Sequence, residues 1–292
     1  MVDIDPAETG KFARLGRRID RAINADARAF LRALLRAAQG GKPAPRREWL
    51  ERIAGWKARY PACPPEFAQG KAVNPYWFVK QLAGRLQEDE IIFSDTGCAL
   101  AWMMQGFEFR RGQRFFHAFN NTPMGYGLPG AIGASFARPG RRVVLVTGDG
   151  SLQMSLYELA TVMRHKLPIK ILMFNNDGHG MVRQTQDMWL EGKHYATSVG
   201  GGLAFPDFVA VARAYGMRAE ALSLNQDIGA RLASVLEAGG PAFLDIRIEP
   251  DQGVAPQVKF GRPNEDAEPL LERKEFLENM IVDPLPVSRQ PL

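Results

Sequence analysis

The chain lacks the features of a disulfide-stapled or metal-clipped protein. Its 292 residues include two cysteines, Cys63 and Cys98, too few for a disulfide scaffold or an iron–sulfur site and too far apart for a CxxC metal clip. No apolar run approaches the about 20 residues that a membrane span requires. The opening residues, MVDIDPAETGK, have neither the basic region nor the apolar core of a signal peptide. We therefore expect a cytoplasmic protein with plain thiols and no membrane contact.

Charge of one sign does not dominate either. Lys and Arg number 37 against 32 Asp and Glu, a net charge of +5, and the basic residues are interleaved with acids. Without a zinc-finger or RNA-binding aromatic motif, this pattern favours a solvated basic surface over a nucleic-acid partner. With 46% hydrophobic and 24% charged residues, the composition is typical of a globular protein with one large or two smaller domains.

The N-terminal part has too few elements to form a core of its own. VDIDPAE reads as the end of a strand followed by a turn, and DARAFLRALLRAAQGG as an amphipathic helix with Phe30, Leu31, Leu34 and Leu35 on one face. One strand and one helix cannot bury their own apolar faces, so residues 1 to about 40 are expected to pack on something else. The linker GGKPAPRREW and a short helix over residues 49–60 follow.

From about residue 70, apolar strands alternate with helices. EIIFSD, RRVVLVT, IKILMFNN and AFLDIRI read as strands without polar alternation, which is typical of a parallel sheet covered on both faces. The predicted helices between them include a small-residue helix in MGYGLPGAIGASFARPG and one helix over residues 151–166. Helices over residues 206–215 and 226–236 follow. The predicted fold class is α/β, a doubly wound parallel sheet.

Unusual polar residues follow two of these strands. TGDGSLQMS, residues 147–155, puts Asp149 between two glycines at a helix start, and Asn175-Asn176-Asp177-Gly178 follows the next strand. A glycine-flanked helix start suits phosphate, but a carboxylate has the wrong charge unless a cation lies between them. Carboxyl ends of adjacent parallel strands share one edge, so Asp149 and Asn176 should meet in an oxygen site suited to Mg²⁺. We expect Asp149 on a turn outside the core.

Four blocks in order resemble one enzyme family. PMGYGLPGAIGA, GDGSLQMSLYELATV, LPIKILMFNNDGHGMVRQ and PDFVAVARAYG look like the cofactor-domain segments of thiamine-diphosphate enzymes, and are most similar to the acetolactate-synthase-like group. GDG alone would be weak support, whereas four blocks with this spacing are specific. The resemblance covers nearly the whole chain and implies thiamine diphosphate and Mg²⁺ as cofactors.

The resemblance also implies roles for matching residues. Asp149, the side chain of Asn176 and the backbone carbonyl of Gly178 would bind Mg²⁺. Met124 would lie beneath the thiazolium ring, and Thr122 would offer its carbonyl to the 4′-amino group. The backbone N–H groups of Ser151, Gly180 and Met181 would bind the diphosphate. The two remaining cofactor-binding positions are Gly148 and Gly150. His179 and Gln184 would lie on the substrate side.

One part that the family needs has no counterpart in this chain. Family members carry a glutamate on a pyrimidine-binding domain, where it protonates the pyrimidine ring, and no segment here resembles that domain. VDIDPAETGK matches the tail of the family's central domain, so we expect a remnant of that domain with a linker over residues 1–65, the cofactor domain over 66–249 and an extension over 250–292. The hypothesis is a split enzyme, a heterodimer of dimers whose second polypeptide supplies the pyrimidine-binding domain and its glutamate. A truncated chain would explain the same pattern.

Two departures from acetolactate synthase leave the substrate open. Thr185 stands where the family enzyme has a tryptophan, and Cys98 and Ala99 replace a glutamine and a histidine. These changes indicate a wider substrate-side pocket, which Thr185 would line, for a 2-keto acid donor and an acceptor that need not be a simple 2-keto acid. Two alternatives remain: the β subunit of a 2-oxoacid oxidoreductase, which should show a cysteine cluster, and a non-catalytic thiamine-diphosphate-binding scaffold.

Overall fold

The computed structural model describes residues 1–16, 18–41 and 44–290 and divides the chain into two compact units, Met1–Tyr60 and Pro61–Leu292. Residues 42 and 43 of the predicted linker, and the last two residues of the predicted extension, lie outside the described residues. The three domain ranges expected from the sequence stay a prediction, and the described part of the extension belongs to the second unit.

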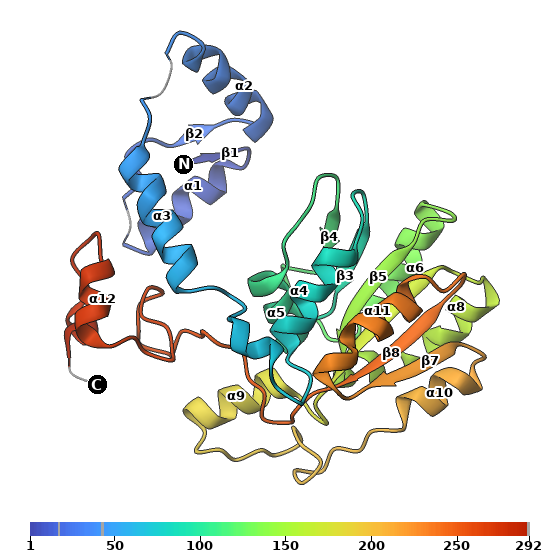
Figure 1. Ribbon diagram of the computed structural model, residues 1–292. Coiled ribbons are helices and arrows are strands. Elements are labelled where there is room, and N and C mark those ends of the chain that lie inside the picture. The colour runs from blue at the N-terminus through green and yellow to red at the C-terminus, as the bar shows by residue number, and fades with distance from the viewer. Residues whose placement is uncertain (17, 42–43, 291–292) are drawn as a thin grey trace. The chain divides into compact units, whose positions relative to one another are not determined.

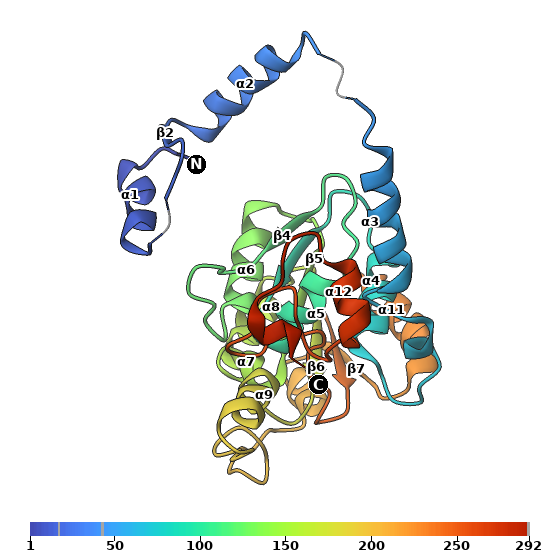
Figure 2. The same cartoon turned by 90° about the vertical axis from the view of Figure 1, so that its left-hand side faces the viewer.

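The first unit contains two short parallel strands and three helices (Figure 2). The chain bends at Ile4, in line with the turn predicted after the first strand, but it then enters a helix that was not predicted. Asp5 caps this helix by accepting a hydrogen bond from the N–H of Ala7 over 2.8 Å, and Pro6 occupies the first helical position, where its missing N–H costs nothing. The elements are β1 (Val2–Asp3), α1 (Pro6–Arg14), β2 (Ile23–Asn24), α2 (Ala27–Ala38) and α3 (Arg47–Arg59).

A six-stranded sheet forms the centre of the second unit (Figure 1). All neighbouring strands pair in parallel, which confirms the predicted fold class. The edge strand β4 was not predicted, because its three residues are too short to give a sequence pattern. In spatial order the strands are β4 (Arg114–Phe116), β3 (Ile91–Ser94), β5 (Val143–Gly148), β6 (Ile169–Asn175), β8 (Ala242–Arg247) and β7 (Arg218–Leu222).

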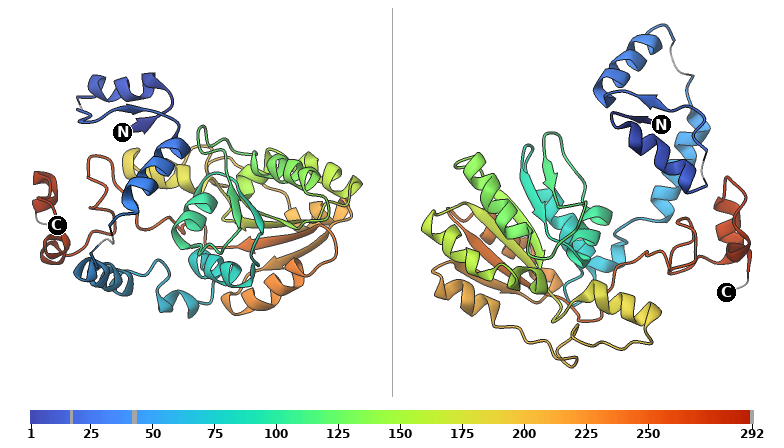
Figure 3. Two further views of the ribbon diagram at one scale, coloured as in Figure 1. Left: turned by 90° about the horizontal axis from the view of Figure 1, so that it is seen from above. Right: turned by 180° about the vertical axis from the view of Figure 1, so that it is seen from behind.

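Helices cover both faces of this sheet, as Figure 3 shows from two further sides. Each face has its own apolar core, which explains why the central strands lack polar alternation. On one face lie α4 (Pro75–Arg85), α5 (Cys98–Gly106) and α11 (Ile228–Leu236). On the other lie α6 (Gly127–Ala137), α8 (Leu159–Arg164) and α10 (Phe208–Ala214). In the described residues no helix has both the length and the apolarity needed to cross a bilayer.

The single helix predicted over residues 151–166 is wrong. The chain forms α7 (Asp149–Gln153), a tight turn, the 3₁₀ helix η2 (Leu156–Glu158) and then α8. The N–H groups of Met154 and Ser155 bond to carbonyls three residues back, which ends the α-helix. Met154 packs there against Gly125, a tertiary contact that local propensity does not contain. The remaining elements are η1 (Pro65–Ala68), α9 (Gly180–Trp189), η3 (Asn225–Asp227), α12 (Arg273–Asn279) and η4 (Pro286–Arg289).

Candidate functional site

The tips of β5 and β6 lie side by side. Gly148 and Phe174 are partners in the register of the two strands, so both loops leave the sheet at the same edge. The carboxylate of Asp149 joins them: it accepts hydrogen bonds from the backbone N–H groups of Gly150 at 2.6 Å, Asn176 at 3.1 Å and Gly178 at 3.2 Å. One carboxylate therefore holds both loops in a fixed arrangement.

Asp149 is part of the core, which corrects the expectation that it sits on a turn outside it. It begins α7 and is 2% exposed. Burial raises its pKa to about 7, because a buried charge loses its hydration, and the three N–H bonds counter this shift only in part. A buried carboxylate whose pKa is raised by the loss of hydration is typical of a site that binds a cation or a substrate.

The oxygens near Asp149 suit a divalent cation. The side-chain amide of Asn176 lies beside the carbonyl of Gly178 and the guanidinium of Arg183: with its nitrogen toward the carbonyl it donates over 2.8 Å, and its oxygen then accepts from Nη2 of Arg183 over 3.3 Å. Asp149, Asn176 and Gly178 thus bring one carboxylate, one amide and one carbonyl group to the same two loops. A set of one carboxylate, one amide and one carbonyl oxygen suits Mg²⁺. The described residues contain no cluster of three His, Cys, Asp or Glu side chains that would favour another metal.

A cleft of about 490 Å³ opens at these strand tips. The N–H groups of Gly180 and Met181, in the first turn of α9, have no carbonyl partner within the helix and suit an anion such as a diphosphate. A Cβ atom at Gly180 would lie 2.4 Å from Nδ2 of Asn176, so only glycine allows the helix to begin this close to the metal-binding loop. The lining includes every predicted site residue except Thr122, Gln184 and Thr185.

His179 and Met124 lie over the GDG turn. A Cβ atom at Gly150 would come 2.4 Å from Nδ1 of His179 and 3.2 Å from Cε of Met124. Nδ1 of His179 is buried and has no hydrogen-bond partner among the described residues. Burial, and secondarily the charge of Arg183, lower the pKa of His179, so its ring is neutral at neutral pH. Both side chains are placed to contact a ligand in the cleft.

The three residues outside the lining have other contacts. The side-chain amide of Gln184 both donates to and accepts from the main chain of Val254, at 2.8 and 3.0 Å. Thr185 donates to the carbonyl of Met181, one turn back in α9, at 3.1 Å. Thr122 has a left-handed backbone conformation with φ of 43°, and its N–H bonds to the carbonyl of Ala118. Their predicted roles stay predictions, and the bonds of Gln184 favour a structural role.

A third strand tip contributes residues that the sequence reading missed. Asp95 follows β3, is 1% exposed, and accepts hydrogen bonds from the N–H groups of Thr96 at 2.9 Å and Gly127 at 3.0 Å. It therefore positions the N-terminus of α6, and the signal that could have found it is an acid directly after a buried strand, as at Asp149. The N-terminus of α5 lines the cleft beside it, where burial raises the pKa of Cys98 to about 12 and keeps its thiol neutral.

Arg183 also went unnoticed in the sequence. Its Nη2 donates to the carbonyl oxygens of Asn176 and Pro250. Its guanidinium would lie 3.3 Å from a Cβ atom at Gly178. Arg183 therefore fixes the Asn176–Gly178 loop from the side of α9, although nothing in its local sequence distinguishes it from a surface arginine.

The fold and the site fit one class of protein: a doubly wound α/β domain whose two neighbouring strand tips could hold the diphosphate of a cofactor through a cation. The sequence model of the family "Thiamine pyrophosphate enzyme, C-terminal TPP binding domain" matches residues 95–246, and the chain belongs to this family. The prediction of thiamine diphosphate as cofactor is thereby confirmed, with Mg²⁺ as the ion usual in the family.

Relatives extend the match beyond this domain. The chain is 30% identical over 95% of its length to an acetolactate synthase large subunit from Cyanidium caldarium and 31% identical over 93% to the isozyme 2 large subunit of Escherichia coli. It spans about half, 46%, of the length of each of these curated relatives. A thiamine diphosphate-dependent 4-hydroxybenzoylformate decarboxylase from Rhodococcus jostii has the same fold over 62% of this chain and 33% of its own, with a TM-score of 0.55 and 24% identity.

Proposed function

We propose that this chain is the cofactor-binding subunit of a split thiamine-diphosphate-dependent enzyme that decarboxylates a 2-keto acid and joins the remaining fragment to an acceptor. The observation that carries the proposal is the convergence of Asp149, Asn176 and Gly178 at the floor of the cleft. When bound, thiamine diphosphate supplies a carbon nucleophile and an electron sink for this chemistry. The similarity to acetolactate synthase large subunits supports the reaction class.

The chain's own residues would bind and orient the cofactor. Asp149, Asn176 and the carbonyl of Gly178 would hold Mg²⁺, and the first N–H groups of α9 would bind the diphosphate. Met124 would contact the cofactor from its place over Gly150, and the neutral ring of His179 would exchange a hydrogen bond at the substrate side. These contacts contribute position and charge stabilisation, which is the protein's share of catalysis in cofactor enzymes.

The proton-transferring glutamate would come from a second polypeptide with a pyrimidine-binding domain. Among the residues that the structure describes, Asp149 is the one carboxyl side chain lining the cleft, and its three bonds to N–H groups hold it against the two loops. We propose a hetero-oligomer, a heterodimer of dimers, with the cofactor bound at the interface of the two polypeptides. The cytoplasmic location expected from the sequence belongs to the same proposal.

The substrate side of the cleft is apolar. Ala99, Leu100, Met104 and Val182 line it, and within the described chain the cleft has no charged side chain other than Asp149. An apolar wall favours substituents larger than a methyl group, because burying each CH₂ contributes about 0.8 kcal/mol. We propose that the substrate, either the 2-keto acid or the acceptor, carries an apolar substituent. The neutral thiol of Cys98, which also lines the cleft, is compatible with such a substituent.

The test measures cofactor binding and turnover in parallel. The full chain is titrated calorimetrically with thiamine diphosphate in Mg²⁺ and in chelator, alone and with the partner polypeptide, and CO₂ release from pyruvate and from larger 2-keto acids is followed. We expect Mg²⁺-dependent binding that tightens with the partner and CO₂ release only in its presence. Full decarboxylation by the chain alone would refute the split. Tight thiamine diphosphate binding without turnover in any mixture would indicate a non-catalytic scaffold. Electron transfer to ferredoxin would indicate a subunit of a 2-oxoacid oxidoreductase.

A further inference from the structure

A second cleft, of about 600 Å³, lies beside the edge of the sheet and shares no lining residue with the cofactor cleft. Its floor is β3 and β4. Arg114 is the register partner of Ile91 and Phe116 that of Phe93, so all four side chains lie on one face of the sheet. The rings of Phe93 and Phe116 stack with centroids 5.1 Å apart, and Phe116 is 40% exposed. Ile91 and Phe93 are almost buried, at 9% and 5% exposed, so Phe116 supplies the solvent-exposed part of this apolar floor.

Small residues of α6 keep the space above this floor empty. Gly133, Ala134 and Ala137 form that wall. A Cβ atom at Gly133 would meet nothing within 4 Å. The volume of the cleft lies in the range of about 300–1,000 Å³ that is usual for small-molecule sites.

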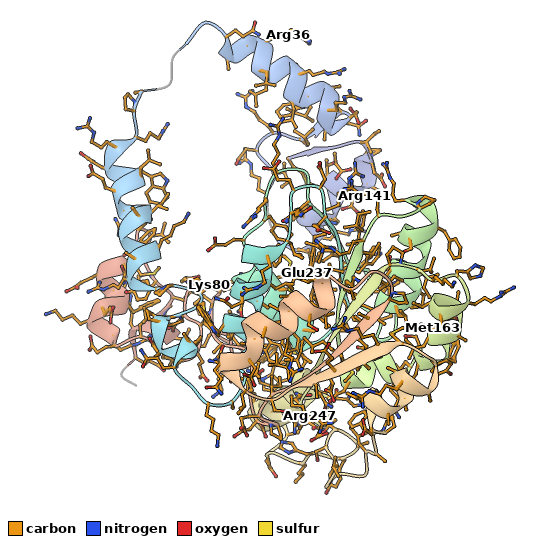
Figure 4. All side chains as sticks on the ribbon, turned by 45° about the vertical axis from the view of Figure 1, so that its right-hand side comes forward. Arg36, Lys80, Arg141, Met163, Glu237 and Arg247 are labelled. Atoms are coloured by element: carbon orange, nitrogen blue, oxygen red, sulfur yellow. The ribbon has the colours of Figure 1, made fainter. Side chains whose placement is uncertain are left out.

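Three arginines surround the apolar floor. Arg141, labelled in Figure 4, donates from Nη2 to the carbonyl of Asp89 at 2.9 Å. For the side chains of Arg114 and Arg138, no hydrogen bond or ion pair occurs within the part of the chain that the structure describes. Asp89 is the one acid among the described lining residues, and its carboxylate lies against Gly112. The rim thus has an excess of positive charge and two guanidinium groups with free donors.

We propose that this cleft binds a small amphipathic anion, a carboxylate with an aliphatic or aromatic body. The body would lie on the Phe93 and Phe116 rings below α6, where it leaves water. The carboxylate would bond to Arg114 and Arg138, since guanidinium groups match carboxylate geometry with paired N–H donors. An inorganic anion would make no apolar contact with the floor, and an uncharged aliphatic molecule would form no ion pair with the arginines. Tight binding therefore needs both parts of the ligand.

The test uses octanoate as the probe on the full chain, with calorimetry at low salt. Octan-1-ol supplies the body without the charge, and inorganic phosphate the charge without the body. We expect octanoate to bind at least tenfold more tightly than either. Arg114→Gln and Arg138→Gln should each weaken octanoate about tenfold, the effect of a lost charged contact worth about 1.4 kcal/mol.

Gly133→Leu tests the location of the site. Its side chain would enter the open space below α6 and should abolish octanoate binding while leaving Mg²⁺-dependent thiamine diphosphate binding unchanged, which separates this site from the cofactor cleft. Gly84→Leu is the matched control, because Gly84 also lies in a helix and its added Cβ would meet nothing within 4 Å. Octanoate binding that survives in Gly133→Leu, or that equals octanol binding in the unaltered chain, would overturn the proposal.

Discussion

Removing the carboxylate of Asp149 should affect folding and cofactor binding separately. The carboxylate accepts three hydrogen bonds from the N–H groups of Gly150, Asn176 and Gly178, all of them buried. In Asp149→Ala, three buried donors lose their acceptor. Each such loss costs about 1–3 kcal/mol before the loops relax, so we expect the free energy of unfolding to fall by about 3–5 kcal/mol. That is a large share of the about 5–15 kcal/mol of a typical domain.

Asp149→Asn separates the two effects. The amide oxygen can still accept the bonds from Asn176 and Gly178 that Oδ2 accepts in the native chain, while the amide NH₂ group faces the N–H of Gly150. We expect a loss of about 1–2 kcal/mol in stability, because one bond is replaced by a contact between two donors. The metal loses its only anionic ligand from this chain, so thiamine diphosphate binding in Mg²⁺ should weaken about 100-fold, equal to about 2.8 kcal/mol.

The assay combines urea unfolding of the metal-free chain with calorimetric titration of thiamine diphosphate in Mg²⁺. Asp177→Asn is the matched control, since it removes one negative charge from the neighbouring loop after β6, at an exposed residue whose φ of 51° suits asparagine. It should change affinity by less than about threefold, an effect under about 0.7 kcal/mol. If Asp149→Asn bound the cofactor as well as this control, the metal assignment would be wrong. Equal stability of Asp149→Ala and Asp149→Asn would contradict the role given to the three N–H bonds.

Three further changes test other contacts. Gly150→Ala places a methyl group 2.4 Å from Nδ1 of His179, so the ring must move, and calorimetry should show at least a tenfold loss of cofactor affinity, about 1.4 kcal/mol, with an unchanged circular dichroism spectrum. Gln184→Ala removes two bonds to the main chain of Val254, and limited proteolysis should cut there faster while cofactor affinity stays the same; an affinity loss would instead support a substrate-side role. Tyr76→Phe removes a buried hydroxyl that donates to the carbonyl and accepts from the N–H of Ala255, and urea unfolding should show a loss of about 1–2 kcal/mol.

The position of the site was predictable because it depends on strand ends. Parallel strands deliver their carboxyl ends to one sheet edge, so two adjacent strands followed by Gly148-Asp149-Gly150 and Asn175-Asn176 had to bring their polar residues together. The degree of burial was not predictable from the same pattern. Whether an acid after a strand faces water or the core depends on what packs over the loop, and here Met124 and His179 cover it.

Elements that depend on contacts with distant residues were not predicted from the sequence. β4 is three residues long and exists because it pairs with β3, and α7 ends where Met154 packs against Gly125. The helix α1 could have been found, because Asp5 and Pro6 form a recognisable helix start. Local patterns therefore predicted the long buried strands, but not β4 or the end of α7, which depend on partners distant in the sequence.

The resemblance implied a substrate-side role for Gln184, and that role stays a prediction. The contacts of its side chain favour a structural role instead. The main chain at Val254, 70 residues further along, takes both of its hydrogen-bonding groups. A side chain with all its polar atoms bonded to its own protein has little left for a ligand. The first turn of α9, whose N–H groups have no helical carbonyl to bond, is by contrast available whatever the side chains are. Contacts made by the backbone at strand tips and helix starts can thus be read from the sequence, whereas side-chain contacts require the fold.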